Sequence, residues 1–448
     1  MTIRTLGVDL GIRAAHVATL CDEQGKRVWS KRRFGNRHDE LEALVGQIGE
    51  CDELTVVMEP TRNAWVPVAA HFMAAGARVV LVPAERSADL RRYYAKHTKN
   101  DRLDSHVLAR LPLLHPEGLH PIGGLGPAEP LRRAVRRRVK LVEWRLACRQ
   151  RIDAMLDLLG PGYAEVLGWA RYGKTALEIL ERYGDPRKLR RLGVNRAATL
   201  IRRVSGGHWG TDQATELIDA AGEALKLWEH DQLDFDELAW DLASEVRLVR
   251  RFDDEISRLE TRIDQLYGKA DPAGIVISAP GVGTVLAGGI LGRLGDANRF
   301  ANLAGVRSFS GMVPKVNQTG HTETRPGITK QGDAGLRRDI WFAADVARQT
   351  DPQLAAKYHR LIVERRLHHY SAICHLATTL LTRIAACWRR NERYVIRDID
   401  GRRITAAEGR AIVRARYRIP PQIRNRARTT HTSSGSAQKG VDQWPLRR

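Results

Sequence analysis

The sequence predicts an α/β domain at the N-terminus, then a long helical segment, then a mainly α-helical C-terminal domain. Residues 1–125 alternate short apolar runs with amphipathic stretches, and residues 126–270 keep helical spacing over long distances. Residues 271–415 combine Gly-rich turns with further helical patterns. Residues 416–448 are rich in Arg, Ser, Thr and Gly and poor in apolar residues, so we expect a disordered basic tail there.

The N-terminal domain should contain a mixed sheet flanked by helices. Three early strands, followed by a strand, a helix and another strand, are typical of such a sheet. The expected strands are Thr5–Val8, His16–Leu20, Val28–Phe34, Thr55–Met58 and Val79–Val82, and the expected helices are Asp39–Ile48 and Ala64–Ala75. Pro112, Pro116 and Pro121, followed by several Gly residues, should mark the exit from this domain.

Two acidic residues stand at the ends of two of these strands. Asp9 ends the first apolar run and is followed two residues later by Gly11, which indicates a strand tip that turns sharply. Glu59 comes directly after Met58, and the following Pro60 cannot donate to a strand ladder, so the strand should stop there. Both carboxylates are therefore expected at an edge of the sheet.

Two further acids, Asp101 and Asp104, begin a segment with helical period, and their spacing puts both on one helix face. Carboxylates held this close repel one another unless a cation lies between them. Mg²⁺ prefers oxygen ligands of this kind, and a pair of such ions supports phosphodiester cleavage. Each acid alone suits a turn or a helix cap, but the ordered set predicts a Mg²⁺ site, with Mn²⁺ as the alternative.

The composition favours a polyanionic partner. The 448 residues carry a formal net charge of +21, and basic side chains that neutralise phosphates gain affinity by releasing counterions. Without a signal-like start or an apolar run of spanning length, we expect a cytoplasmic, nucleoid-associated protein that does not use a membrane. The five scattered cysteines predict neither a disulfide framework nor a zinc site.

Two long helices are expected in the middle segment. The first has a basic surface around an apolar stripe at spacings of 4, 3 and 4, formed by Val135, Val139, Val142 and Leu146. Its basic residues, which a phosphate backbone could follow, are Arg132, Arg133, Arg136, Arg137, Arg138 and Lys140. The second has a coiled-coil seam formed by Val249, Phe252, Ile256, Leu259, Ile263 and Leu266. The two helices should pair or dimerise, although ordinary bundle helices would show the same patterns.

The C-terminal domain should open with a turn and a helix. Pro280-Gly-Val-Gly283 and the small apolar residues after it suit a helix-hairpin-helix whose amides could hold a phosphate, or simply a turn. Residues 311–320 and 327–332 are polar and Gly-rich, which predicts loops. Helices should follow over 334–348, 352–366 and 371–390. The histidines and Cys374 of this region lack zinc-site spacing.

These motifs, taken in order, resemble the DEDD transposases of the insertion-sequence 110 group over roughly residues 3–400. The matching acids are Asp9, Glu59, Asp101 and Asp104, and the C-terminal matches are Pro280-Gly-Val-Gly283, Gly311-Met-Val-Pro314, Thr319-Gly320 and Ile328-Thr-Lys-Gln-Gly332. The resemblance implies an RNase H-like, RuvC-like domain, a coiled-coil segment, a transposase domain, DNA at the element ends and target, and a homo-oligomer. Some members use a bridge RNA as guide, which leaves open an RNA partner.

One position departs from the family pattern. The family's catalytic serine precedes a Gly, and here Thr319 stands in that slot. The resemblance implies that this hydroxyl attacks a DNA phosphate beside the metal site and forms a covalent intermediate. Threonine keeps the hydroxyl, but its methyl group restricts χ1 and crowds in-line attack. Ser308 and Ser310 lie upstream and do not match the slot, so Thr319 is the expected nucleophile, as a working or a weakened variant.

Other classes of function stay open at this point. A RuvC-like structure-selective nuclease, or an inactive relative that only binds nucleic acid, would carry similar acids. The segment Gly7-Val-Asp-Leu-Gly11 also resembles the first phosphate loop of actin-like sugar kinases. A second apolar run that leads into an Asp-x-Gly phosphate loop does not follow, and a small sugar does not explain the charge of +21, so the kinase ranks lowest.

Overall fold

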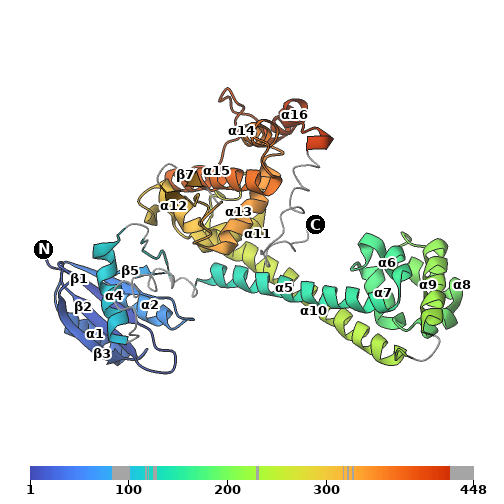
Figure 1. Ribbon diagram of the computed structural model, residues 1–448, viewed down its shortest axis with the longest axis horizontal. Coiled ribbons are helices and arrows are strands. Elements are labelled where there is room, and N and C mark those ends of the chain that lie inside the picture. The colour runs from blue at the N-terminus through green and yellow to red at the C-terminus, as the bar shows by residue number, and fades with distance from the viewer. Residues whose placement is uncertain are drawn as a thin grey trace. The chain divides into compact units, whose positions relative to one another are not determined.

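The computed structural model describes residues 1–82, 101–116, 119, 121–124, 129–228, 232–315, 317–319, 322–324 and 327–423. For residues 101–104, 169, 317–319 and 322–324 it describes the backbone only. The chain divides into two compact units, Met1–Arg133 with Ile263–Arg448, and Ala134–Arg262 (Figure 1). Among the described residues, no helix is long and apolar enough to cross a membrane.

The N-terminal part of the first unit contains a five-stranded mixed sheet. The strands are β1 (Ile3–Asp9), β2 (His16–Cys21), β3 (Arg27–Phe34), β4 (Glu53–Met58) and β5 (Arg78–Leu81), and the helices are α1 (His38–Ile48), α2 (Trp65–Ala74) and α4 (Asp101–Leu114). The strand order is β3-β2-β1-β4-β5, with β1, β2 and β3 antiparallel and β4 and β5 parallel to β1. All the expected strands and helices are present, with ends that differ by one or two residues. Pro112 lies inside α4 rather than beyond it.

Helices cover both faces of this sheet. Leu6, Val8 and Met58 form one apolar core with residues of α1 and α2. Val57, which alternates with Met58 along β4, belongs to a different cluster together with Leu108 of α4. Since side chains alternate between the two faces of a strand, α1 and α2 cover one face and α4 covers the other (Figure 1).

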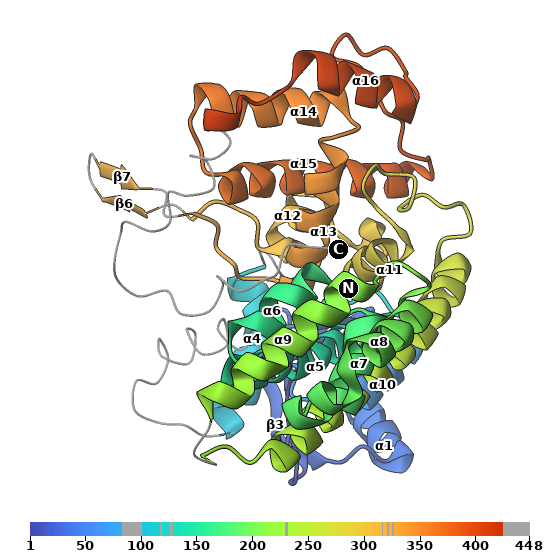
Figure 2. The same cartoon turned by 90° about the vertical axis from the view of Figure 1, so that its right-hand side faces the viewer.

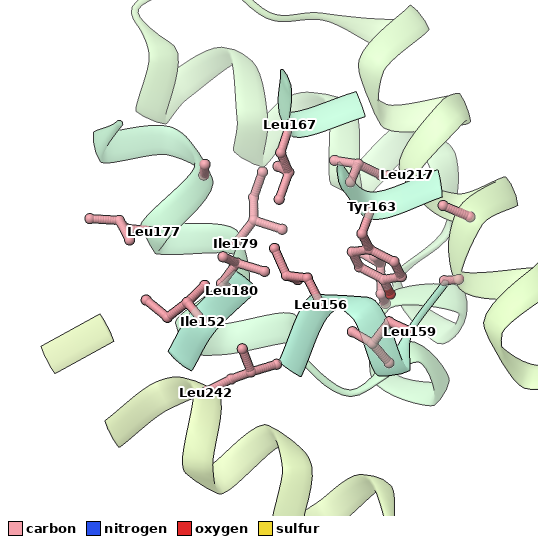
Figure 3. Packing of buried hydrophobic residues seen from close by; sticks show 14 of the residues in the cluster. Ile152, Leu156, Leu159, Tyr163, Leu167, Leu177, Ile179, Leu180, Leu217 and Leu242 are labelled. Carbon is pink, nitrogen blue, oxygen red and sulfur yellow. The ribbon is translucent and has the colours of Figure 1, made fainter. Parts of the chain in front are cut away.

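The second unit is helical. Its elements are α5 (Pro130–Leu158), α6 (Pro161–Leu167), α7 (Lys174–Tyr183), α8 (Pro186–Ser205), α9 (Thr211–Leu227) and α10 (Phe235–Ala270), and the ends of α5 and α10 continue into the first unit. Sequence analysis predicted the two long helices but not the lobe that α6–α9 form between them. The core of this lobe contains Ile152, Leu156, Tyr163, Leu180, Leu217 and Leu242 (Figure 3).

The helices α5 and α10 pair antiparallel within the chain. Arg138 Nε lies 2.7 Å from Glu260 Oε1, and Arg145 donates to Asp253. Leu141, which stands between Arg138 and Arg145 on α5, is buried. The pairing follows the expectation, whereas a supercoil stays a prediction.

The predicted apolar stripe on α5 was wrong by about one position. Val135 is buried, but Val139, Val142 and Leu146 are only half-buried. The buried residues that follow Val135 along the helix are Leu141, Cys148, Ile152, Leu156 and Leu159. Arg138 and Arg145 stand on the side of α5 that faces α10, where Glu260 and Asp253 neutralise them. A search for apolar residues alone therefore does not identify this side of the helix. On α10, Val249, Ile256 and Ile263 are buried as predicted.

The C-terminal part of the first unit is mainly helical. It contains α11 (Thr284–Leu294), α12 (Leu303–Ser310), α13 (Ala334–Ala347), α14 (Pro352–His359), α15 (His369–Arg390) and α16 (Ala406–Arg416). Between α12 and α13, where loops were expected, a short hairpin of β6 (Asn317–Thr319) and β7 (Thr322–Thr324) extends from the helices (Figure 2). Residues 424–448 of the predicted tail lie outside the described residues.

Candidate active-site residues

Asp9 and Glu59 stand at the same end of two neighbouring strands. The strands β1 and β4 run parallel, and Val8 of β1 pairs with Met58 of β4. Each acid comes one residue after this pair, Asp9 as the last residue of β1 and Glu59 directly after β4. Both side chains are partly buried, and both have interactions with other groups of the protein. The parallel register therefore brings the two acids to one edge of the sheet.

The alternation of β1 also tells which face Asp9 occupies. A Cβ atom added to Gly7 would lie 2.0 Å from the Ser105 carbonyl oxygen of α4, so Gly7 faces that helix. Asp9 is two residues further along the strand and has the same orientation. On β4, Val57 faces α4, and the same alternation assigns Glu59 to that side. Both acids consequently belong to the face that α4 covers.

The start of α4 is held against the sheet by two contacts. The helix backbone approaches β1 at Gly7, and Thr19 Oγ1 of β2 lies 2.8 Å from Ser105 Oγ, a hydrogen bond between two fully buried side chains. Asp104 directly precedes Ser105, and Asp101 is the first residue of the helix, as predicted. The backbone thus places both acids at the end of α4 anchored beside β1, while their side chains lie outside the described residues.

The close approach at Gly7 was not recognised from the sequence, although a Gly inside the apolar run Leu6–Val8 was its signal. We expect Gly7→Ala to lower the free energy of unfolding by about 3 kcal/mol. The added methyl would meet backbone atoms of Ser105 and Ala109, which cannot move without displacing α4. Thermal unfolding checks this, with Gly46→Ala as control, because a Cβ there would meet nothing within 4 Å. Equal melting temperatures for both variants would contradict the close approach.

Two of the C-terminal motifs form the base of the β6–β7 hairpin. Thr329 N donates to Val313 O at 2.9 Å, Lys330 N donates to Gly311 O at 3.1 Å, and Pro314 bridges Ile328. The segment Gly311–Pro314 therefore pairs with Ile328–Gly332. Gly311 has a φ of 67°, which favours glycine and ends α12. The two motifs are therefore two sides of one structural feature, the base of the hairpin.

A buried ion cluster ties this base to the helix after the Pro-Gly-Val-Gly turn. Arg293 of α11 donates to Asp333 at 3.0 Å and lies 3.5 Å from Asp339. Burial alone would raise the pKa of Asp333, but Arg293, the Leu336 amide and Arg132 hold that pKa below its usual range. Burial raises the pKa of Asp339 despite its arginine neighbours. Gly335 permits this arrangement, because a Cβ there would lie 2.0 Å from the Arg293 guanidinium carbon.

Thr319 is the last paired residue of β6, opposite Thr322 of β7. Its side chain, and Gly320 after it, lie outside the described residues. Ser310, the alternative upstream hydroxyl, is fully buried and donates to Arg307 O at 2.7 Å. Thr319 belongs to the C-terminal part of the chain, so its meeting with the four acids stays a prediction.

The basic helix differs from the expected phosphate-binding surface. Arg138 pairs with Glu260, and Arg137 Nη2 lies 3.8 Å from Glu255 Oε2. Arg138 is thus engaged with an acid of the same chain. Arg136 is exposed, and it keeps the orientation towards solvent that phosphate contact requires.

Comparisons with known proteins match both the N-terminal and the C-terminal part of the chain to transposase families. A family model of the IS110 DEDD domain, described as "Transposase", matches residues 6–161, and one described as "Transposase IS116/IS110/IS902 family" matches residues 273–359. Together the two segments make up more than half of the chain. The first contains all four acids and the second contains Thr319.

Full-length relatives extend the similarity over most of the chain. An insertion element IS900 uncharacterized 42 kDa protein of Mycobacterium paratuberculosis is 27% identical over 395 residues, 87% of this chain and 96% of that protein. An IS110 uncharacterized 43.6 kDa protein of Streptomyces coelicolor is 25% identical, covering 81% and 88%. The transposase for IS1111A of Coxiella burnetii is 23% identical, covering 81% and 84%. The chain therefore belongs to the IS110/IS116/IS902 family of insertion-sequence transposases, enzymes that process DNA.

Proposed function

We propose that this protein cuts and rejoins DNA at the ends of an insertion sequence in a Mg²⁺-dependent reaction, with an RNase H-like N-terminal domain as its metal-binding part. The observation that carries the proposal is the position of the four acids. Asp9 ends β1, Glu59 directly follows the neighbouring parallel strand β4, and the anchored start of α4 supplies Asp101 and Asp104. Strand order and acid positions together favour a DEDD nuclease over a scaffold that only binds nucleic acid.

The residues suit a Mg²⁺ site. Four carboxylates are hard oxygen ligands, and gathering them at one edge without a cation would be electrostatically unfavourable. Bound there, Mg²⁺ would polarise the scissile phosphate and stabilise the leaving oxygen. Asp9 and Glu59 would hold the site from the rigid sheet, and Asp101 and Asp104 would close it from α4.

Thr319 is the proposed nucleophile. Its Oγ would form a bond to phosphorus while one P–O bond of the DNA backbone breaks, the hydroxyl proton leaves Oγ, and the departing DNA oxygen becomes a hydroxyl. The hairpin suits this task because its base is fixed by the paired motifs and the Arg293–Asp333 contact, while Thr319 lies at its far end. Rejoining reverses the step with another DNA hydroxyl as nucleophile.

DNA at the element ends and target is the proposed partner, and a guide RNA and self-association are further parts of the proposal. The net charge of +21 supports a nucleic-acid partner. Sequencing of the nucleic acid that copurifies with the untreated protein tests the RNA. A discrete RNA transcribed from beside the gene supports guidance, and DNA fragments alone argue against it.

The reaction itself is tested with DNA carrying the element ends. Strand exchange should occur with Mg²⁺ or Mn²⁺ and stop when EDTA removes the metal, while DNA binding persists. Return of activity on adding Mg²⁺ shows that the protein stayed intact. Exchange that continues in EDTA would contradict the proposed metal site.

The structure distinguishes two arginines of the basic helix α5, the exposed Arg136 and the ion-paired Arg138. Arg136→Gln should weaken DNA binding and reduce the slope of log affinity against log salt by about 1, as expected for one lost phosphate contact. Arg138→Gln should leave the slope unchanged and instead lower the melting temperature, because it leaves Glu260 unpaired. Salt-dependent binding and thermal unfolding of both variants give the comparison. An unchanged salt slope for Arg136→Gln would show that Arg136 does not contact a DNA phosphate.

A further inference from the structure

The outer surface of α1 and α2 carries a second group of metal-ligating side chains. His38 and Glu42 are four residues apart on α1, and His71 lies on α2. His71 Nε2 is 3.3 Å from Glu42 Oε1, and His38 Nδ1 is 3.9 Å from the same oxygen. The three ligand atoms all lie within 4.8 Å of one another.

These separations fit a tetrahedral transition-metal ion. With metal–ligand bonds of about 2.0–2.1 Å, tetrahedral ligands stand about 3.4 Å apart. The 3.3 Å distance already matches, and His38, whose side chain is 83% exposed, is free to turn towards the centre. Two imidazoles and one carboxylate are a ligand set that Zn²⁺ accepts, with water in a fourth position.

His71 provides independent support for a ligand at this place. Its side chain is 15% exposed, and in the described part of the chain its buried Nε2 makes no hydrogen bond, although Glu42 stands close. A buried polar atom without a hydrogen-bond partner is destabilising. Coordination would satisfy this nitrogen. Asp39 and Glu40 in the same first turn of α1 add negative charge that favours a cation nearby.

We propose that His38, Glu42 and His71 form a Zn²⁺-type site that joins α1 to α2. The site is separate from the four acids, because α1 and α2 cover the face of the sheet opposite α4. Its ligands are mostly imidazole nitrogens, whereas the four acids offer only oxygen. The bound ion stabilises the outer helical layer of the domain and does not take part in the DNA chemistry.

Co²⁺ serves as the spectroscopic probe. The untagged full-length protein is titrated with Co²⁺ in excess Mg²⁺, which occupies oxygen-only sites. We expect a visible absorption band that saturates at one equivalent and disappears when Zn²⁺ is added. His71→Ala and Glu42→Gln should each weaken binding by about 100-fold or more, above the effect of losing an outer-shell partner.

Two further variants, His38→Ala and Asp9→Asn, distinguish loss of metal coordination from misfolding and from binding at the four acids. His38→Ala removes an exposed ligand that cannot disturb the core, so its loss of the band reports coordination rather than misfolding. Asp9→Asn should keep the full band. Absence of a band in the native protein, or a band that survives both histidine substitutions, would show that the three residues form only a surface ion-pairing group. A band lost with Asp9→Asn would place the ion at the four acids and equally overturn the proposal.

Discussion

Asp9→Asn is expected to reduce Mg²⁺-dependent strand exchange by about 1,000-fold or more, a loss of about 4 kcal/mol in transition-state stabilisation. Asn keeps the shape of the side chain but removes a charged ligand, so the metal geometry is lost while β1 stays intact. DNA binding should persist, because removing one negative charge does not weaken attraction to phosphate. Single-turnover assays at saturating protein measure the exchange step directly.

The same loss is expected for Glu59→Gln, Asp101→Asn and Asp104→Asn, since all four acids are proposed to act as one unit. The matched control is Glu53→Gln, which changes the same residue type on the same strand. Glu53 is exposed and begins β4, six residues before Glu59 and at the opposite end of the sheet. Full strand exchange by Asp9→Asn, or an equal loss of strand exchange in Glu53→Gln and Glu59→Gln, would contradict the proposal that the four acids bind the catalytic metal.

Thr319→Ala is expected to abolish both strand exchange and covalent protein–DNA adducts on a nicked suicide substrate, because no oxygen remains to attack phosphorus. Thr319→Ser should keep or raise activity, since it retains the oxygen and removes the methyl group that restricts χ1. Denaturing gels count the adducts, and peptide mapping by mass spectrometry identifies the modified residue. The pair of variants separates loss of the nucleophile from general damage to the hairpin.

The hairpin offers its own control residue. Thr322 pairs directly with Thr319 across the two strands, so Thr322→Ala removes a hydroxyl from the same hairpin with the same change in volume. It should still form adducts. Adducts that persist in Thr319→Ala would show that another residue or a water makes the cut, even though the family assignment stands.

Much of the N-terminal domain could be predicted because its signals are local. Apolar runs ending in Asp9 and Glu59 predicted strands, and the structure has both strands with the acids at their ends. The helical period after Asp101 likewise predicted α4. The parallel register of β1 and β4, which brings the two acids to one edge, depends on residues about 50 positions apart and required the folded chain.

The basic helix shows the limit of pattern analysis. The spacing of apolar residues predicted a stripe that continued to Leu146, and the charge pattern placed Arg138 on a basic surface that a phosphate backbone could follow. In the fold, Arg138 and Arg145 occupy the seam because Glu260 and Asp253 of α10 lie opposite. From the sequence alone, a charged residue on the contact side of a helix is expected to be exposed. It can be buried only when an opposite charge pairs with it, and the sequence does not show that partner.

The sequence by itself predicted the strands and helices of the N-terminal sheet domain, the two long helices, the four candidate acids and the Thr-Gly slot, because period, turn residues and motif order can be read along the chain. Only the tertiary structure decided the contact of α4 with Gly7, the hairpin whose two base motifs pair, the ion cluster of Arg293, and the meeting of His38 and Glu42 with His71. Each of these brings together atoms from separate segments. Such distances follow from how the segments pack, and no local pattern contains that information.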